Sequence, residues 1–73
     1  MNAPLLKAVN RYIHNNEIYD NVIFVGQDNK NTYVVFDNNG DALHCISIIK
    51  KYFSVTATLM RLGNLNQFRI IFN

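Results

Sequence analysis

The sequence has a single cysteine, Cys45, and no tryptophan, and it contains only one proline and three glycines. A lone cysteine excludes an internal disulfide and a zinc site built from four cysteines. No apolar run approaches the roughly 18–20 residues of a membrane-spanning helix, and residues 1–4 lack the basic-then-apolar pattern of a signal peptide. We therefore expect no membrane segment. The unpaired thiol favours a reducing, cytoplasmic location.

Motifs for catalysis and cofactor binding are also missing. The three glycines are scattered along the chain, so no glycine-rich phosphate loop is present, and neither serine lies in a nucleophile elbow. All five carboxylates fall in predicted turns or at strand ends, where Asp commonly caps or turns the chain. We expect no catalytic residues, no cofactor and no enzymatic activity.

One pair of neighbouring residues, His44-Cys45, invites a metal or thiol hypothesis. Adjacent residues of a helix point about 100° apart, so these two side chains do not converge on one ligand by themselves. Free cysteine commonly serves as a small core residue. We expect Cys45 to lie in the core, His44 to be solvated, and no metal site to form.

The length and composition predict one small folded domain spanning residues 1–73. Apolar residues make up 49% of the chain and charged residues only 16%, which favours a folded domain over a disordered segment. A chain of this length buries only about 60% of its unfolded surface. Small scaffolds of this kind gain stability from a partner subunit or from an unusually good core.

The first half of the chain predicts a helix followed by two strands. Apolar residues recur at helical spacing over residues 4–14, where Pro4 suits the first turn. Residues 17–27 and 32–37 are rich in β-formers and flank a short polar loop. Both strands are apolar on both faces, with Ile23 and Val25 opposite Phe24 in the first.

The second half repeats this order. Asn38-Asn39-Gly40-Asp41 predicts a turn, and Asp41 is a suitable N-cap for a helix over residues 42–53. On that helix one arc is apolar, comprising Ala42, Cys45, Ile46, Ile48, Ile49, Tyr52 and Phe53. Strands are predicted over residues 54–62 and 67–73, joined by a turn at 63–66; in the last strand Phe68, Ile70 and Phe72 face inward and Arg69 and Ile71 outward.

The elements therefore follow the order αββαββ, which predicts an α+β fold. Its sheet has four mainly antiparallel strands from two hairpins, with two helices packed on it. The two halves end in similar four-residue sequences, Val34-Val35-Phe36-Asp37 and Ile70-Ile71-Phe72-Asn73. An internal duplication and independent strand preference for such residues both explain this likeness, and the topology does not depend on the choice.

The placement of the helices decides whether a surface is left uncovered. If both helices cover one face of the sheet, the other face exposes some of Phe24, Tyr33, Val35, Met60 and Ile71. An apolar patch of this kind usually marks an interface, and a homodimer is the commonest way to cover it. If one helix packs on each face, nothing is left exposed. The sequence leaves both arrangements open.

Charge divides the chain into an acidic half and a basic half. Residues 1–41 hold three basic and five acidic residues, a formal charge of 3 − 5 = −2, whereas residues 42–73 hold four basic residues and no acid, a charge of +4. The basic half suits either an acidic protein surface or a nucleic-acid backbone. A net charge of +2 is modest for a dedicated nucleic-acid binder.

Together these features predict a non-enzymatic interaction protein that binds a macromolecular partner and modulates, most simply inhibits, its activity. The twelve asparagines and eight isoleucines are typical of an AT-rich genome, which suggests a phage or mobile-element protein acting in the host cytoplasm. A nucleic-acid-binding regulator is the alternative. The partner contacts that we expect are electrostatic at Lys50, Lys51, Arg61 and Arg69, and apolar at Tyr33 and Ile71.

Overall fold

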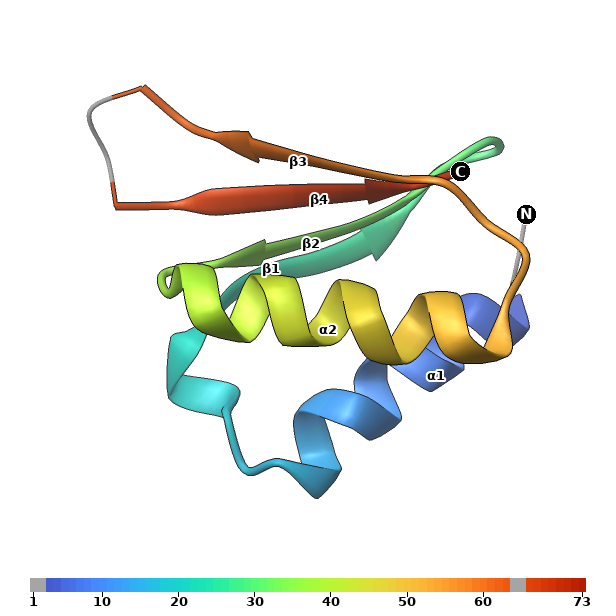
Figure 1. Ribbon diagram of the computed structural model, residues 1–73, viewed down its shortest axis with the longest axis horizontal. Coiled ribbons are helices and arrows are strands. Elements are labelled where there is room, and N and C mark those ends of the chain that lie inside the picture. The colour runs from blue at the N-terminus through green and yellow to red at the C-terminus, as the bar shows by residue number, and fades with distance from the viewer. Residues whose placement is uncertain (1–2, 64–65) are drawn as a thin grey trace.

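The computed structural model describes residues 3–63 and 66–73 and has an α+β fold in the predicted αββαββ order (Figure 1). Its elements are α1 (Ala3–Asn15), a 3₁₀ turn η1 (Tyr19–Asn21), β1 (Val22–Gln27), β2 (Thr32–Phe36), α2 (Asn39–Tyr52), β3 (Ala57–Arg61) and β4 (Phe68–Phe72). The strands form one antiparallel sheet in the order β1-β2-β4-β3. The second strands of the two hairpins therefore lie at its centre.

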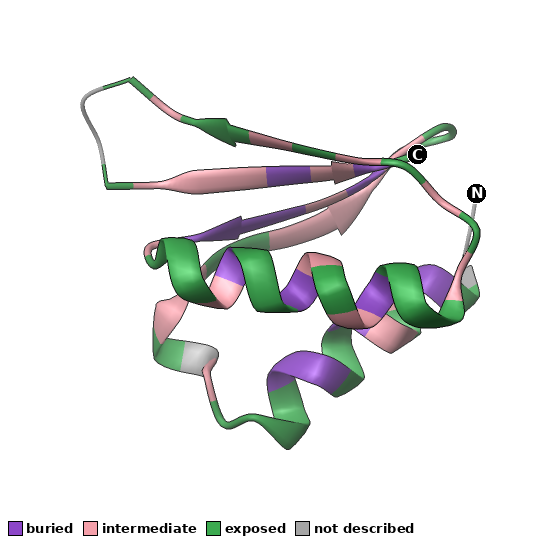
Figure 2. Cartoon of the chain, in the orientation of Figure 1, coloured by how far each residue is buried: buried purple, intermediate pink, exposed green. Residues whose placement is uncertain are grey.

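Both helices pack on the same face of the sheet. The buried core joins Leu5, Val9, Tyr12 and Ile13 of α1 and Ala42, Cys45 and Ile49 of α2 to Val34, Phe36, Ile70 and Phe72 of the central strands. In Figure 2 the buried positions lie where the helices meet the sheet. Inward placement of Phe68, Ile70 and Phe72 is confirmed. Of the two helix arrangements that the sequence allowed, the one with an uncovered sheet face is observed.

The start of α2 differs from the prediction. The helix begins at Asn39, because Asn38 caps it: the Asn38 side-chain oxygen accepts the backbone N–H of Asp41 at 3.1 Å. Asp41 thus lies in the first turn, where its carboxylate accepts a hydrogen bond from the Asn21 amide at 2.7 Å. Asn and Asp are both good N-caps, and sequence alone does not rank two candidates three positions apart. The apolar arc is otherwise as expected, except that Tyr52 is 70% exposed.

The first strand is shorter than predicted and contains a register shift. Residues 19–21 form the 3₁₀ turn, so β1 begins at Val22. Val22 pairs with Phe36 and Phe24 pairs with Val35, with a bulge between them. Val22 and Val25 therefore pack on the core, and the prediction that Ile23 shares the face of Val25 is wrong, since the bulge interrupts simple alternation.

The second hairpin alternates as predicted. Ala57 and Leu59 pack against the core while Thr58 and Met60 face the other way. Part of its predicted turn, residues 64 and 65, lies outside the described residues. Among the residues that are described, no helix has both the length and the apolar character needed to cross a membrane.

Candidate functional site: the uncovered face of the sheet

The sheet has one face without helices, and we call it the open face (Figure 1). Successive strand residues point to opposite faces, and directly paired residues share a face. Because Val34 and Ile70 point to the core, their strand neighbours and the partners of those neighbours define the open face. Its residues are Phe24, Tyr33, Val35, Thr58, Met60, Arg69 and Ile71.

Most of the open face is apolar, and two of its large side chains are exposed. Phe24 is 54% exposed and Met60 43% exposed, whereas Tyr33 and Ile71 are half-buried. Val35, which the sequence placed among the exposed candidates, is only 7% exposed because side chains of neighbouring strands flank it. Large apolar side chains left exposed on an uncovered sheet face are a common mark of an interaction site.

The outer end of the Phe24 ring lies close to Gly26 of the same strand. A Cβ atom built at Gly26 would lie 2.7 Å from Phe24 Cζ, closer than two such carbons approach each other. Glycine at this position therefore makes room for the aromatic ring, an arrangement that stabilises a strand glycine. The result is an exposed aromatic ring at the β1 edge of the open face.

Tyr33 is held at one end of the open face by hydrogen bonds. Its hydroxyl donates to Asp28 Oδ2 at 2.7 Å and accepts the Asn31 side-chain amide at 3.1 Å. Asp28 also accepts the backbone N–H groups of Lys30 and Asn31, each at 2.8 Å. The hydrogen bond from Tyr33, followed by these backbone bonds, lowers the pKa of Asp28. This carboxylate is thus already supplied with donors.

Arg69 is the one charged residue within the open face. Among the described residues its buried Nε has no hydrogen-bond partner, and its Nη2 donates to the thioether sulfur of Met60 at 3.7 Å. Its cross-strand neighbours are Val35 and Met60, neither of which accepts strongly. Within residues 3–63 and 66–73 no carboxylate pairs with this guanidinium. Arg69 therefore presents a partly desolvated cation in apolar surroundings.

The structure brings together three of the six residues that the sequence singled out. Tyr33, Arg69 and Ile71 lie on the open face, and Tyr33 pairs directly with Ile71. Lys50 and Lys51 lie in the last turn of α2, and Lys51 Nζ lies 5.7 Å from the centre of the Tyr52 ring.

Arg61 lies apart from both groups. It pairs with Phe68 and so points to the helix side of the sheet. Since β3 and α2 run in opposite directions in Figure 1, Arg61 lies at the other end of the fold from the two lysines. The four basic residues therefore do not share one surface.

His44 and Cys45 point apart, as their spacing predicts. Cys45 is fully buried, and burial raises its pKa from the ordinary 9.0 to about 12, so the reactive thiolate is strongly disfavoured. His44 is exposed and its Nδ1 lies 3.0 Å from the Tyr12 hydroxyl. The described residues contain no group of three or more side chains that could hold a metal ion.

The buried thiol makes the fold sensitive to alkaline pH. An unfolded chain loses the Cys45 proton near pH 9, whereas the folded chain keeps it up to about pH 12. The folded state then binds more protons, so the free energy of unfolding should fall as pH rises from about 9 to about 12. Urea unfolding at a series of pH values measures how steeply the free energy of unfolding falls with pH. Cys45→Ala should show a shallower slope, and an unchanged slope would contradict this assignment.

Comparison with protein-family models, with curated proteins and with solved structures gives no match to this chain.

Proposed function

We propose that this chain is a protein-interaction module that docks a partner protein on its open face and thereby modulates, most simply inhibits, that partner. The observation that carries the proposal is the one-sided packing: both helices lie on one face, and the other presents Phe24, Met60 and Ile71 around Arg69. Interface cores are enriched in aromatic residues, Met and Arg, which is the composition found here.

The chemistry of the face defines the partner. Arg69 lacks an acidic partner among the described residues, and residues 42–73 contain no carboxylate. A partner that places a carboxylate against Arg69, surrounded by apolar side chains, would supply the missing acceptor and cover the exposed rings.

A second copy of the chain fits this face less well. Two-fold pairing would bring two Arg69 guanidinium groups into one interface. The carboxylate at the end of the face, Asp28, already accepts three hydrogen bonds. We therefore favour a different, acidic protein as the partner over a homodimer.

The asparagine- and isoleucine-rich composition supports a phage or mobile-element origin with a host protein as the target.

Affinity capture from the source cell tests the proposal with two matched variants. Met60→Asp adds a charge to the open face, and Leu43→Asp adds the same charge to α2, at a position that is 52% exposed. Both replace an exposed apolar side chain, so neither should unfold the domain. We expect the wild-type chain and Leu43→Asp to recover the same stoichiometric protein and Met60→Asp to lose it.

Three results would contradict the proposal. Recovery of the partner by Met60→Asp would place the contact elsewhere. Recovery of nucleic acid alone, with binding that weakens steeply as salt rises, would favour the nucleic-acid-binding alternative. A stable dimer by light scattering, in place of the 8.5 kDa monomer, would mean that a second copy covers the open face.

A further inference from the structure

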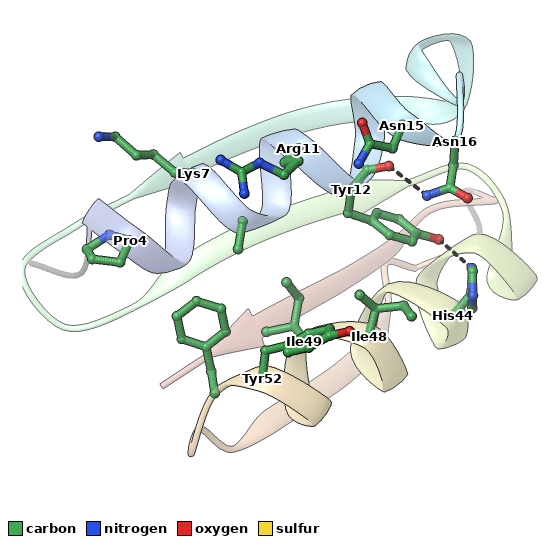
Figure 3. A pocket seen from close by; sticks show the side chains of 12 residues that line it. Pro4, Lys7, Arg11, Tyr12, Asn15, Asn16, His44, Ile48, Ile49 and Tyr52 are labelled. Atoms are coloured by element: carbon green, nitrogen blue, oxygen red, sulfur yellow. Dashed lines mark hydrogen bonds between the residues drawn. The ribbon is translucent and has the colours of Figure 1, made fainter.

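A groove runs between α1 and α2, in the helix layer and away from the open face (Figure 3). Its volume is about 600 Å³, within the roughly 300–1,000 Å³ typical of small-molecule sites. The sequence does not predict this groove, because the groove depends on how α1 and α2, which are distant in the chain, pack together. It is independent of the proposed partner surface.

The groove has an apolar floor and wall. Ala8 of α1 lies in it, and Ile48 and Ile49 of α2 line the facing side, followed by the rings of Tyr52 and Phe53. Tyr52 is 70% exposed, the highest value among the large hydrophobic residues whose exposure the structure describes. An apolar ligand lying in the groove would cover this ring and the half-buried Ile48 and Phe53.

The rim of the groove on α1 is cationic. Lys7 and Arg11 are four positions apart, so they project from the same side of the helix, and both are exposed. Figure 3 shows these two side chains along the α1 edge, opposite Ile48 and Tyr52 of α2. None of the described residues that line the groove is acidic. The groove thus combines apolar surface with positive charge on one side only.

One end of the groove is closed by polar groups. The Tyr12 hydroxyl lies 3.0 Å from His44 Nδ1, and the two rings meet edge to face with centres 5.4 Å apart. Asn16 closes the same end, with its side-chain amide donating to the Tyr12 carbonyl at 2.8 Å. Burial raises the pKa of Tyr12 to about 12, so the hydroxyl stays neutral. The Tyr12–His44 contact ties α1 to α2 at this end of the groove.

We propose that this groove binds a small anionic amphiphile, with its hydrocarbon body against Ala8, Ile48 and Phe53 and its anionic head between Lys7 and Arg11. Charge complementarity requires the anion, since the rim offers two cations and no acid. The apolar floor requires a hydrocarbon body, because a fully hydrated anion would leave it uncovered. A carboxylate, sulfonate or phosphate head meets the same requirement.

Decanoate, used below its micelle concentration, is a suitable probe. Titration into the ¹⁵N-labelled protein should give saturable shifts of amide signals in α1 and α2, with those of the open-face strands unchanged. Lys7→Glu/Arg11→Glu should weaken binding at least about tenfold. The control Lys30→Glu/Lys50→Glu makes the same change in net charge at exposed positions outside the groove, and should stay within about threefold of wild type.

A neutral alcohol of the same chain length, 1-decanol, separates the charge from the tail. We expect it to bind at least about tenfold more weakly than decanoate. Absence of saturable decanoate binding would overturn the proposal. So would equal weakening in both double variants, equal affinity for 1-decanol, or shifts confined to the sheet. Because neither double variant touches the open face, capture of the protein partner should be unaffected.

Discussion

Replacing Phe36 with Ala is expected to lower the free energy of unfolding by about 3–5 kcal/mol. Phe36 is fully buried, at the point where β2 packs beneath the helices. Removing its ring leaves a cavity among side chains that relax only in part. The loss is of the same order as the whole stability of so small a domain, so we expect a largely unfolded protein at ambient temperature.

Phe24→Ala provides the matched control. It removes the same ring from the same sheet, but from the open face, where the residue is already 54% exposed. We expect it to lower the free energy of unfolding by about 1 kcal/mol, mainly because the contact between the ring and Gly26 is lost. Urea unfolding followed by far-ultraviolet circular dichroism compares the two. Equal losses would contradict a core on one side of the sheet, because they would mean that Phe24 is also packed.

Much of the fold could be predicted from the sequence because local patterns determine it. In β4, alternation alone assigned Ile70 and Phe72 to the core and Arg69 and Ile71 to the other face, and the structure confirms this. The helical spacing of Leu5, Val9 and their neighbours likewise gave α1 its buried side. These periodicities depend only on the geometry of strand and helix.

The remaining features depend on contacts between distant segments. Ile23 was misplaced because a bulge, set by pairing with β2, breaks the alternation. The side of the sheet that receives each helix does not follow from the sequence, since the amphipathic patterns fit both arrangements. Tyr33, Arg69 and Ile71 could be named as candidates, but only the pairing of β2 with β4 brings them together. The register of β3 on β4 pairs Arg61 with Phe68 and so puts it on the opposite face from Arg69, although the charge pattern groups the two arginines.

Arg69→Glu is expected to weaken binding of the captured partner by roughly 100-fold. Breaking a charge pair that is buried in an interface costs about 2–5 kcal/mol, and each factor of ten in affinity corresponds to about 1.4 kcal/mol. Arg69→Met separates charge from shape, since it keeps a long apolar side chain. It should also lose binding, yet be at least as stable as wild type, because it removes a buried Nε donor that has no acceptor in the described part of the chain.

Docking on the open face is tested most directly by calorimetry with one purified partner. The measurement compares the dissociation constants of the Arg69→Glu and Arg61→Glu variants. Both variants reverse one arginine in the second hairpin, but Arg69 lies on the open face and Arg61 points to the helix side. We predict a loss of roughly 100-fold for Arg69→Glu and a change below about threefold for Arg61→Glu. Equal losses, or unchanged binding by Arg69→Glu, would contradict docking on this face.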